Sequence, residues 1–113
     1  MASCIFCKIL AKQAPGKIVY EDESCVAFED IHPQAPVHLL VTPRKHFSSV
    51  EECGEAEEPV LGHLYRVAAK LAQQYHITDG YRMVANTGMG AGQSVFHFHL
   101  HVLGGRLFRW PPG

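Results

Sequence analysis

Three histidines alternate with apolar residues close to the C-terminus of this 113-residue chain, in the segment HFHLHVL. Residues two apart in a β-strand project from the same face, about 7 Å from one another. A strand over residues 97–103 therefore places His97, His99 and His101 on one face and turns the apolar residues between them toward the core. This regular alternation favours a chemical site over a chance accumulation of histidines.

Two kinds of chemistry use histidines in this spacing: zinc binding with an open position for water, and nucleophilic attack by a neutral imidazole. On a straight strand the outer rings of His97 and His101 lie about 14 Å apart. One zinc ion with ligand distances of about 2 Å cannot bind both of them. The spacing disfavours a three-histidine metal site and favours His99 as a nucleophile toward phosphorus or an acyl carbon.

A glycine-rich run, GMGAG at residues 88–92, leads through Gln93 and Ser94 into the histidine segment. Small residues leave backbone N–H groups accessible, and these groups together with a hydroxyl are what a phosphate needs. The run alone is typical of any turn, but its junction with three histidines predicts that phosphate binds beside His99.

The spacing Cys4-x-x-Cys7 is typical of metal or redox sites, although two cysteines make only half of a zinc site. Cys25 and Cys53 stand alone and are expected to be small buried residues. No signal-peptide pattern precedes them, so we expect a cytoplasmic protein with reduced thiols.

The composition is that of a single globular domain, which we expect to span residues 1–113. Apolar residues make up 47% of the chain, and ten basic against eleven acidic residues leave a formal net charge of −1. Such a balance argues against binding of long nucleic acid, while a small anion held by local groups remains compatible. No apolar run approaches the roughly 20 residues that a membrane-spanning helix needs.

Hydrophobic periodicity predicts an α+β fold, with a mainly antiparallel sheet, one short helix and one long helix. The short helix is expected within residues 3–13, with Ser3 as its N-cap, and the long helix from Glu57 to about Tyr75. Strands are expected over residues 17–22, 24–30, 37–44, 81–87 and 97–103, the first two forming a hairpin.

The segment QSVFHFHLHVL resembles the signature of the histidine triad (HIT) nucleotide-binding proteins. The resemblance continues through CIFCKI, AFEDIHPQAPVHLLVTPRKH, DGYRMVANTG and HVLGGRLFRWPPG. The last two stretches resemble the Hint branch, the purine nucleoside phosphoramidases. A histidine rather than a glutamine at position 101 fits the hydrolase branches better than the transferases.

This resemblance implies a mechanism in which His99 attacks the α-phosphorus of a nucleoside 5′-phosphoramidate and water then cleaves the nucleotidyl-histidine intermediate. His101 and Ser94 would contact the phosphate and the leaving group, with His97 and His38 supporting the triad. No magnesium or other cofactor is required by this scheme. The resemblance also implies a homodimer in which the five-stranded sheets continue across the interface, the long helices pack together and the Trp110–Pro111–Pro112 tail reaches the neighbouring site.

The resemblance further implies a nucleotide pocket in which Asp30 accepts hydrogen bonds from the ribose hydroxyls and an apolar slot holds the purine. The slot residues are Phe6, Ile9, Phe28 and Ile31, and the remaining contacts to an AMP- or GMP-type ligand are Asn86, Gly92, Gln93, Ser94, Val95, His99 and His101.

Many HIT proteins that begin with CIFCKI complete a Cys₂His₂ zinc site, and the resemblance implies Cys4, Cys7, His46 and His97 as the matching residues. We therefore expect a structural zinc ion. Two alternatives to the phosphoramidase stay open: a nucleotide-binding regulatory module with little turnover, and a zinc-dependent hydrolase with water as nucleophile. No role is predicted for His32, His63 and His76.

Overall fold

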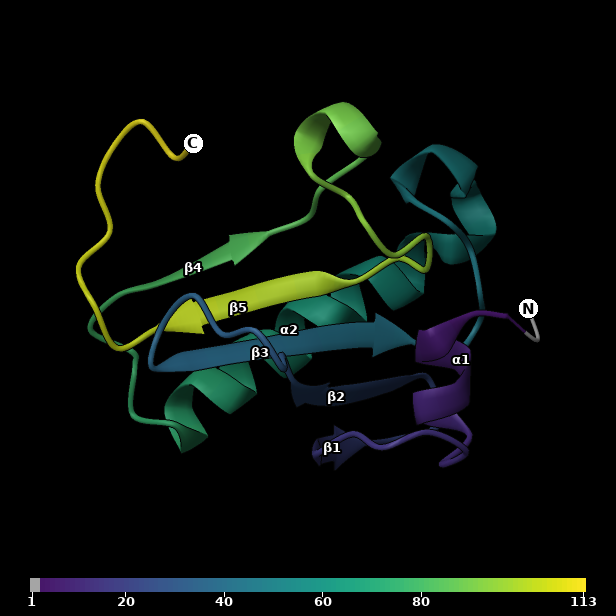
Figure 1. Cartoon of the computed structure of the whole chain (residues 1–113), viewed down its shortest axis with the longest axis horizontal. Helices are drawn as coiled ribbons and strands as arrows, with labels where there is room; N and C mark the ends of the chain where they lie inside the picture. The colour runs from purple at the N-terminus through teal and green to yellow at the C-terminus, as the bar shows by residue number, and fades with distance from the viewer. Residues whose placement is uncertain (1–2) are drawn as a thin grey trace.

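The computed structural model describes residues 3–113 as a five-stranded antiparallel sheet with a helix on each face (Figure 1). The strand order is β1-β2-β3-β5-β4, and every neighbouring pair is antiparallel. The α+β prediction with one long and one short helix is confirmed. The strands are β1 (Ile18–Glu21), β2 (Cys25–Glu29), β3 (Val37–Pro43), β4 (Tyr81–Val84) and β5 (Leu100–Gly104).

Helix α2 (Glu58–Gln74) covers the rear face of the sheet in Figure 1 and forms the main core with it. Its buried residues recur three and four positions apart, which places them on one stripe of the helix. They are Leu64, Val67, Ala68, Leu71 and Ala72. The predicted limits Glu57 and Tyr75 are each one residue outside the helix. His76 ends it by adopting a left-handed conformation, with φ of 58°.

Helix α1 (Ile5–Leu10) lies on the opposite face and is shorter than the predicted segment 3–13. Its N-cap is Cys4 and not Ser3, because the Cys4 Sγ atom accepts a hydrogen bond from the Cys7 backbone N–H at 3.3 Å. A helix of this length is marginal by itself and depends on tertiary packing. That packing is a second, smaller apolar cluster of Phe6, Ile9, Leu10, Val26, Phe28 and Leu40.

The histidine segment is only partly a strand, which corrects the prediction of a strand over residues 97–103. The ladder between β3 and β5 ends where Val41 pairs with Leu100. Pro43 has no N–H to extend the ladder, and its carbonyl accepts a hydrogen bond from the His97 ring at 2.9 Å. The alternation of faces nevertheless holds, because Phe98, Leu100 and Val102 all lie in the main core.

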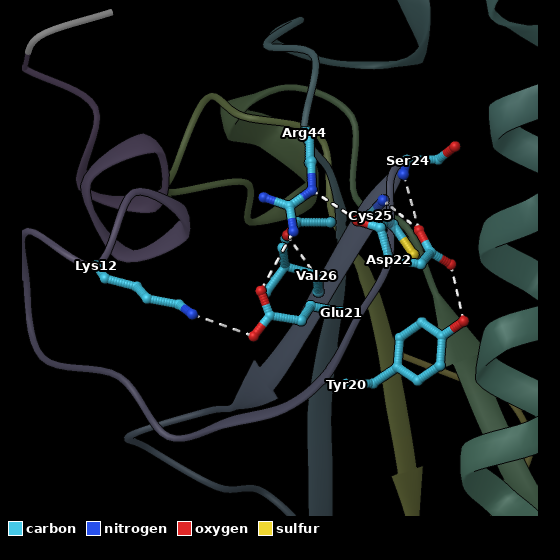
Figure 2. A network of polar contacts seen from close by, with 9 residues as sticks. Lys12, Tyr20, Glu21, Asp22, Ser24, Cys25, Val26 and Arg44 are labelled. Carbon is cyan, nitrogen blue, oxygen red and sulfur yellow. Dashed lines mark hydrogen bonds and ion pairs between the residues drawn. The ribbon is translucent and has the colours of Figure 1, made fainter.

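The turn between β1 and β2 is closed by Asp22, whose carboxylate collects four hydrogen bonds. Figure 2 shows those with Tyr20, Ser24 and Cys25. The backbone N–H groups of Ser24 and Cys25 donate to one oxygen, while the Tyr20 hydroxyl and the His63 ring bond the other. Burial alone would raise the pKa of Asp22, but these hydrogen bonds together lower it below its usual value. His63, for which no role was predicted, thereby ties α2 to the hairpin.

A second set of contacts holds the same hairpin to the chain that follows β3. Figure 2 shows Arg44 beside Glu21, which also faces Lys12. The Arg44 Nε–H donates to the Asp22 carbonyl at 2.7 Å. These contacts therefore join the β1–β2 turn to the end of β3.

The two isolated cysteines behave as small apolar residues. Cys25 is fully buried in the main core, and burial raises its pKa to about 12, so its thiol stays protonated. Cys53 is half-buried and packs against the same core. None of the helices within residues 3–113 combines the length and apolar character that crossing a bilayer demands.

Gly104 marks a close approach of β5 to Ile77, and this contact leads to a stability prediction. A Cβ atom at position 104 would lie 2.5 Å from Ile77 Cδ1 and 2.9 Å from Ile77 Cβ. Gly104→Ala should lower the free energy of unfolding by about 1–3 kcal/mol through overpacking, measured by denaturant titration. Gly62→Ala is the matched control in α2, where no atom lies within 4 Å, and it should be neutral or stabilising.

Candidate active site

The central histidine, His99, is held with one ring nitrogen free. Its Nδ1 atom lies 2.7 Å from the His97 carbonyl oxygen, and since a carbonyl only accepts, Nδ1 carries the proton. The neutral ring therefore presents an unprotonated Nε2. Phe6 packs edge-on against this ring at 5.0 Å between centroids. Burial lowers the pKa of His99, which favours the neutral ring at neutral pH.

A chain of hydrogen bonds sets the tautomer of His101. The Gln34 backbone N–H donates to His38 Nδ1 at 3.0 Å, so the neutral His38 ring carries its proton on Nε2. That Nε2 lies 2.9 Å from His101 Nδ1, which accepts. The His101 proton consequently resides on Nε2, the other edge of its ring. The contribution of Gln34 is a backbone group, and no residue-type pattern signals it.

The surroundings of His101 and His38 keep both rings neutral. Burial lowers the pKa of His101 to about 4, with the nearby His99 and His38 acting in the same direction. Burial also lowers the pKa of His38, against the opposing charge of Asp30. Asp30 Oδ2 lies 3.4 Å from His38 Nε2, while its Oδ1 accepts from the His32 backbone N–H at 2.8 Å.

A cavity of about 370 Å³ opens between α1, the end of β2 and the glycine-rich loop, and most of the residues predicted for the nucleotide line it. It brings together an apolar side and a polar end in one slot. The predicted residues along its wall are Phe6, Ile9, Phe28, Asp30, Ile31, Asn86, Gly92, Ser94, Val95, His99 and His101. Phe6 and Phe28 meet edge to face at 5.2 Å, whereas Ile31 is largely exposed and forms part of the rim.

Gln93 is the one predicted nucleotide contact that does not line this cavity. It is buried, its Oε1 accepts from the Gly88 backbone N–H, and its amide donates to the Ser48 and Val95 carbonyls. Gly88 and Gly92 have φ of 87° and 91°, a region that favours glycine. Gln93 thus braces the loop that carries Ser94 into the slot.

Sequence reasoning missed several residues of the wall. His32, for which no role was predicted, lines the slot, as do Pro15 and Gly16. The remaining ones are Ile5, Glu29 and Leu40. A turn and a loop histidine carry no periodic signal, so their position emerges only when α1 folds back over the sheet.

The four predicted metal ligands, which include His97 of the triad, lie close together. Cys7 Sγ lies 3.3 Å from His46 Nδ1 and 3.5 Å from His97 Nδ1, Cys4 Sγ lies 3.5 Å from His97 Nδ1, and the two Nδ1 atoms are 3.1 Å apart. Zinc bond lengths give tetrahedral edges of about 3.6 Å between sulfur and nitrogen and about 3.4 Å between two nitrogens. The His97 ring donates from Nε2 to Pro43, which leaves Nδ1 free to face the sulfurs. The donor set and its spacing therefore fit zinc.

Two further groups of potential ligands occur among the described residues. Asp30, His38 and His101 have atoms within 4.8 Å of one another, and so have Asp22, Cys25 and His63. In each group two of the candidate ligands already share a hydrogen bond, His38 with His101 and His63 with Asp22. Each group offers three ligands where the cysteine–histidine cluster offers four.

Comparison with known proteins identifies the family. The sequence profile described as "Scavenger mRNA decapping enzyme C-term binding" matches residues 3–107. A HIT-like protein from Synechococcus elongatus is 48% identical over 109 residues, which cover 96% of each chain. The chain belongs to the histidine triad family.

Solved structures agree with this assignment. A HIT family hydrolase from Legionella pneumophila is 45% identical with a TM-score of 0.96, covering 98% of this chain and all of the other. A zinc-bound HIT family protein from Mycobacterium smegmatis is 34% identical with a TM-score of 0.81, covering 93% of this chain and 76% of the other. The fold of this HIT protein is that of the HIT family hydrolases.

The tautomer chain leads to a pH prediction for His101. Its ring should stay neutral with the proton on Nε2 from pH 7 down to pH 5, and protonate with a pKa of about 4, because burial disfavours the charged form. Unfolded histidine binds a proton near pH 6.5, so stability should decrease as the pH falls between these values. Nitrogen-detected NMR of labelled imidazoles measures the pKa of the His101 ring and identifies which of its nitrogens carries the proton. A pKa near 6.5, or a proton on Nδ1, contradicts the prediction.

Proposed function

We propose that this HIT protein hydrolyses purine nucleoside 5′-phosphoramidates, or related AMP and GMP conjugates, through a nucleotidyl-histidine intermediate on His99. The observation that carries the proposal is the hydrogen bond from His99 Nδ1 to the His97 carbonyl, which reserves the Nε2 lone pair for attack. The stretches DGYRMVANTG and HVLGGRLFRWPPG, which resemble the Hint branch, support the choice of substrate class.

The chemistry proceeds in two displacements at phosphorus. In the first, the bond between His99 Nε2 and phosphorus forms while the phosphorus–nitrogen bond breaks, and the amine leaves with the bonding electron pair. Solvent protonates the amine, and the proposal assigns the passing of this proton to the hydroxyl of Ser94, which is exposed and lines the slot. In the second, water attacks phosphorus and releases its proton to solvent. The electron pair of the broken bond returns to Nε2, and the nucleoside monophosphate departs.

The surrounding groups supply positioning and electrostatics, which are the main demands of phosphoryl transfer. The His101 Nε2–H donates to a phosphoryl oxygen, and backbone N–H groups of the glycine-rich loop near Gly92 do the same. Asp30 has an oxygen at the slot that can accept from the ribose hydroxyls, while Phe6 and Phe28 offer ring faces and edges to the purine. Charge on the transferred group is thus stabilised without a magnesium ion.

A structural zinc ion is proposed for the cluster of Cys4, Cys7, His46 and His97. The donor set, the near-tetrahedral spacing and the zinc-bound HIT protein from Mycobacterium smegmatis support it. When bound, the ion would join α1 to the segment that carries the triad, and the displacement at phosphorus needs nothing from it.

We also propose that residues 1–113 form one HIT domain that works as a homodimer in the reducing cytoplasm. Strand β4 ends the sheet without a further strand partner among residues 3–113, and Tyr65 on α2 is half exposed, which together suit pairing of sheets and helices between two copies. The exposed Trp110 in the C-terminal tail is then available to the neighbouring slot.

Loss of the nucleophile tests the proposed function. His99→Ala should lower turnover of a fluorogenic adenosine phosphoramidate at least about 10³-fold, because no other group in the slot takes over the attack. A denaturant quench of the wild-type reaction at alkaline pH, where the phosphorus–nitrogen bond survives, should yield a nucleotidylated peptide containing residue 99. His63→Gln, outside the slot, is the control and should retain turnover and the adduct.

The same experiment separates the alternatives. Unchanged turnover in His99→Ala would contradict the nucleophile assignment. Binding of AMP with an intact phosphoramidate would support the regulatory module. Turnover that stops on chelation and leaves no adduct would support a zinc-dependent hydrolase, with Asp30, His38 and His101 as its ligands.

The zinc proposal predicts a metal content. Protein produced with zinc and purified without chelators should contain about one zinc ion per chain, measured by mass spectrometry of the metal. Cys7→Ser should remove most of it, whereas Cys53→Ser, outside the cluster, should leave it unchanged. Less than about 0.2 zinc ions per wild-type chain would contradict a structural site.

A further inference from the structure

The short helix α1 serves two sites with alternate residues. Cys4 at its N-cap and Cys7 in its first turns point into the cysteine–histidine cluster, while Phe6 and Ile9 of the same helix line the nucleotide slot. A rigid-body shift of six helical residues would therefore alter both sites at once.

The histidine segment is shared in the same way. The His97 ring belongs to the cluster, whereas its carbonyl accepts the hydrogen bond that orients His99 in the slot. Phe6 of α1 contacts both histidines of this segment. Its ring packs edge-on against His99 at 5.0 Å and tilted against His97 at 6.1 Å between centroids. Helix α1 and the histidine segment therefore contact each other both in the cluster and around His99.

We infer that metal occupancy of the Cys4–Cys7–His46–His97 cluster and nucleotide occupancy of the slot are thermodynamically coupled through Phe6 and the His97–His99 segment. The inference rests on the proposed function, since it takes a purine nucleoside monophosphate as the ligand of the slot. Zinc sets the distance between α1 and the histidine segment, and this distance determines the width of the slot and the position of Phe6 against His99.

The physical basis is the weak intrinsic stability of α1. A helix this short is not stable alone. The contacts that hold α1 to the rest of the protein include one apolar cluster, the Phe6 ring contacts with His97 and His99, and the thiol–imidazole contacts of the metal site. Without an ion the thiol–imidazole contacts join neutral groups weakly, so α1 samples more positions. Ordering α1 then reduces the net free energy of nucleotide binding. By linkage, each ligand strengthens the other by the same factor.

The test uses the full chain kept under a non-thiol reductant, in a zinc-loaded form freed of excess metal and in a zinc-free form whose fold is checked by circular dichroism. Calorimetry with AMP should give an affinity about fivefold or more higher for the zinc-loaded form, the lower end of typical coupling. Equilibrium competition with a chromogenic chelator should show the zinc affinity rising by the same factor at saturating AMP.

Phe6→Leu tests the bridge between the two sites, because it retains all four ligands and an apolar side chain in the cluster that packs α1, and removes the ring that contacts both histidines. Zinc should still bind, and saturating AMP should no longer raise zinc affinity. If saturating AMP raises the zinc affinity of Phe6→Leu as much as that of wild type, the inference is overturned. This result would also be obtained if zinc-free protein unfolded and the two ligands were coupled only through folding. Cys53→Ser is the control and should behave as wild type.

The outcomes distinguish this inference from the proposed function. AMP affinity that is equal with and without zinc overturns the coupling and leaves the hydrolase intact. Absence of AMP binding by both forms, with an intact phosphoramidate, overturns the proposed function and the coupling with it. Absence of zinc from metal-replete protein overturns the coupling alone.

Discussion

The organisation of the site depends on the burial of one imidazole, that of His97. Its Nε2 donates to the Pro43 carbonyl at the end of β3, its Nδ1 faces two cysteine sulfurs, and its backbone carbonyl orients His99. A fully buried polar ring is tolerated only when its nitrogens have partners. Meeting that requirement joins the sheet, helix α1 and the nucleophile at a single residue.

The same constraint governs the rest of the triad. Burying several imidazoles side by side disfavours their charged forms, so each must accept and donate as a neutral ring. The chain from Gln34 through His38 to His101 does this with one proton for each ring. Among the described residues, no fully buried side-chain nitrogen or oxygen lacks a partner. The hydrogen bonds that satisfy the buried rings therefore also fix the tautomers that the proposed phosphoryl transfer requires.

The two faces of the sheet divide stability from function. On the face under α2, large aliphatic residues pack into a closed core with a long helix. On the other face, the six-residue α1 covers only part of the sheet and leaves the slot open beside it. A short, weakly anchored helix is a natural place for control by a ligand, whereas the core face supplies the rigid platform that the triad needs.

Much of this protein follows from local pattern. The 3.6-residue period of α2, the hairpin of β1 and β2 and the alternation of Phe98, Leu100 and Val102 were all predictable, since each depends on neighbours in sequence. So were the identities of the triad and of most of the slot, once the resemblance to the family was recognised. Side-chain type and spacing determine which groups are available for chemistry.

Tertiary structure decided what those groups do. The different roles of the three histidines were expected from the resemblance, and the tertiary structure gives each its own hydrogen-bond partners. The β3–β5 ladder ends before Pro43, and the Pro43 carbonyl accepts from the His97 ring. Gln93 became a brace for a loop, and a backbone N–H of Gln34 set the tautomer of His101. Hydrogen-bond partners far apart in sequence decide where each proton resides, and no periodicity of residue types encodes such contacts.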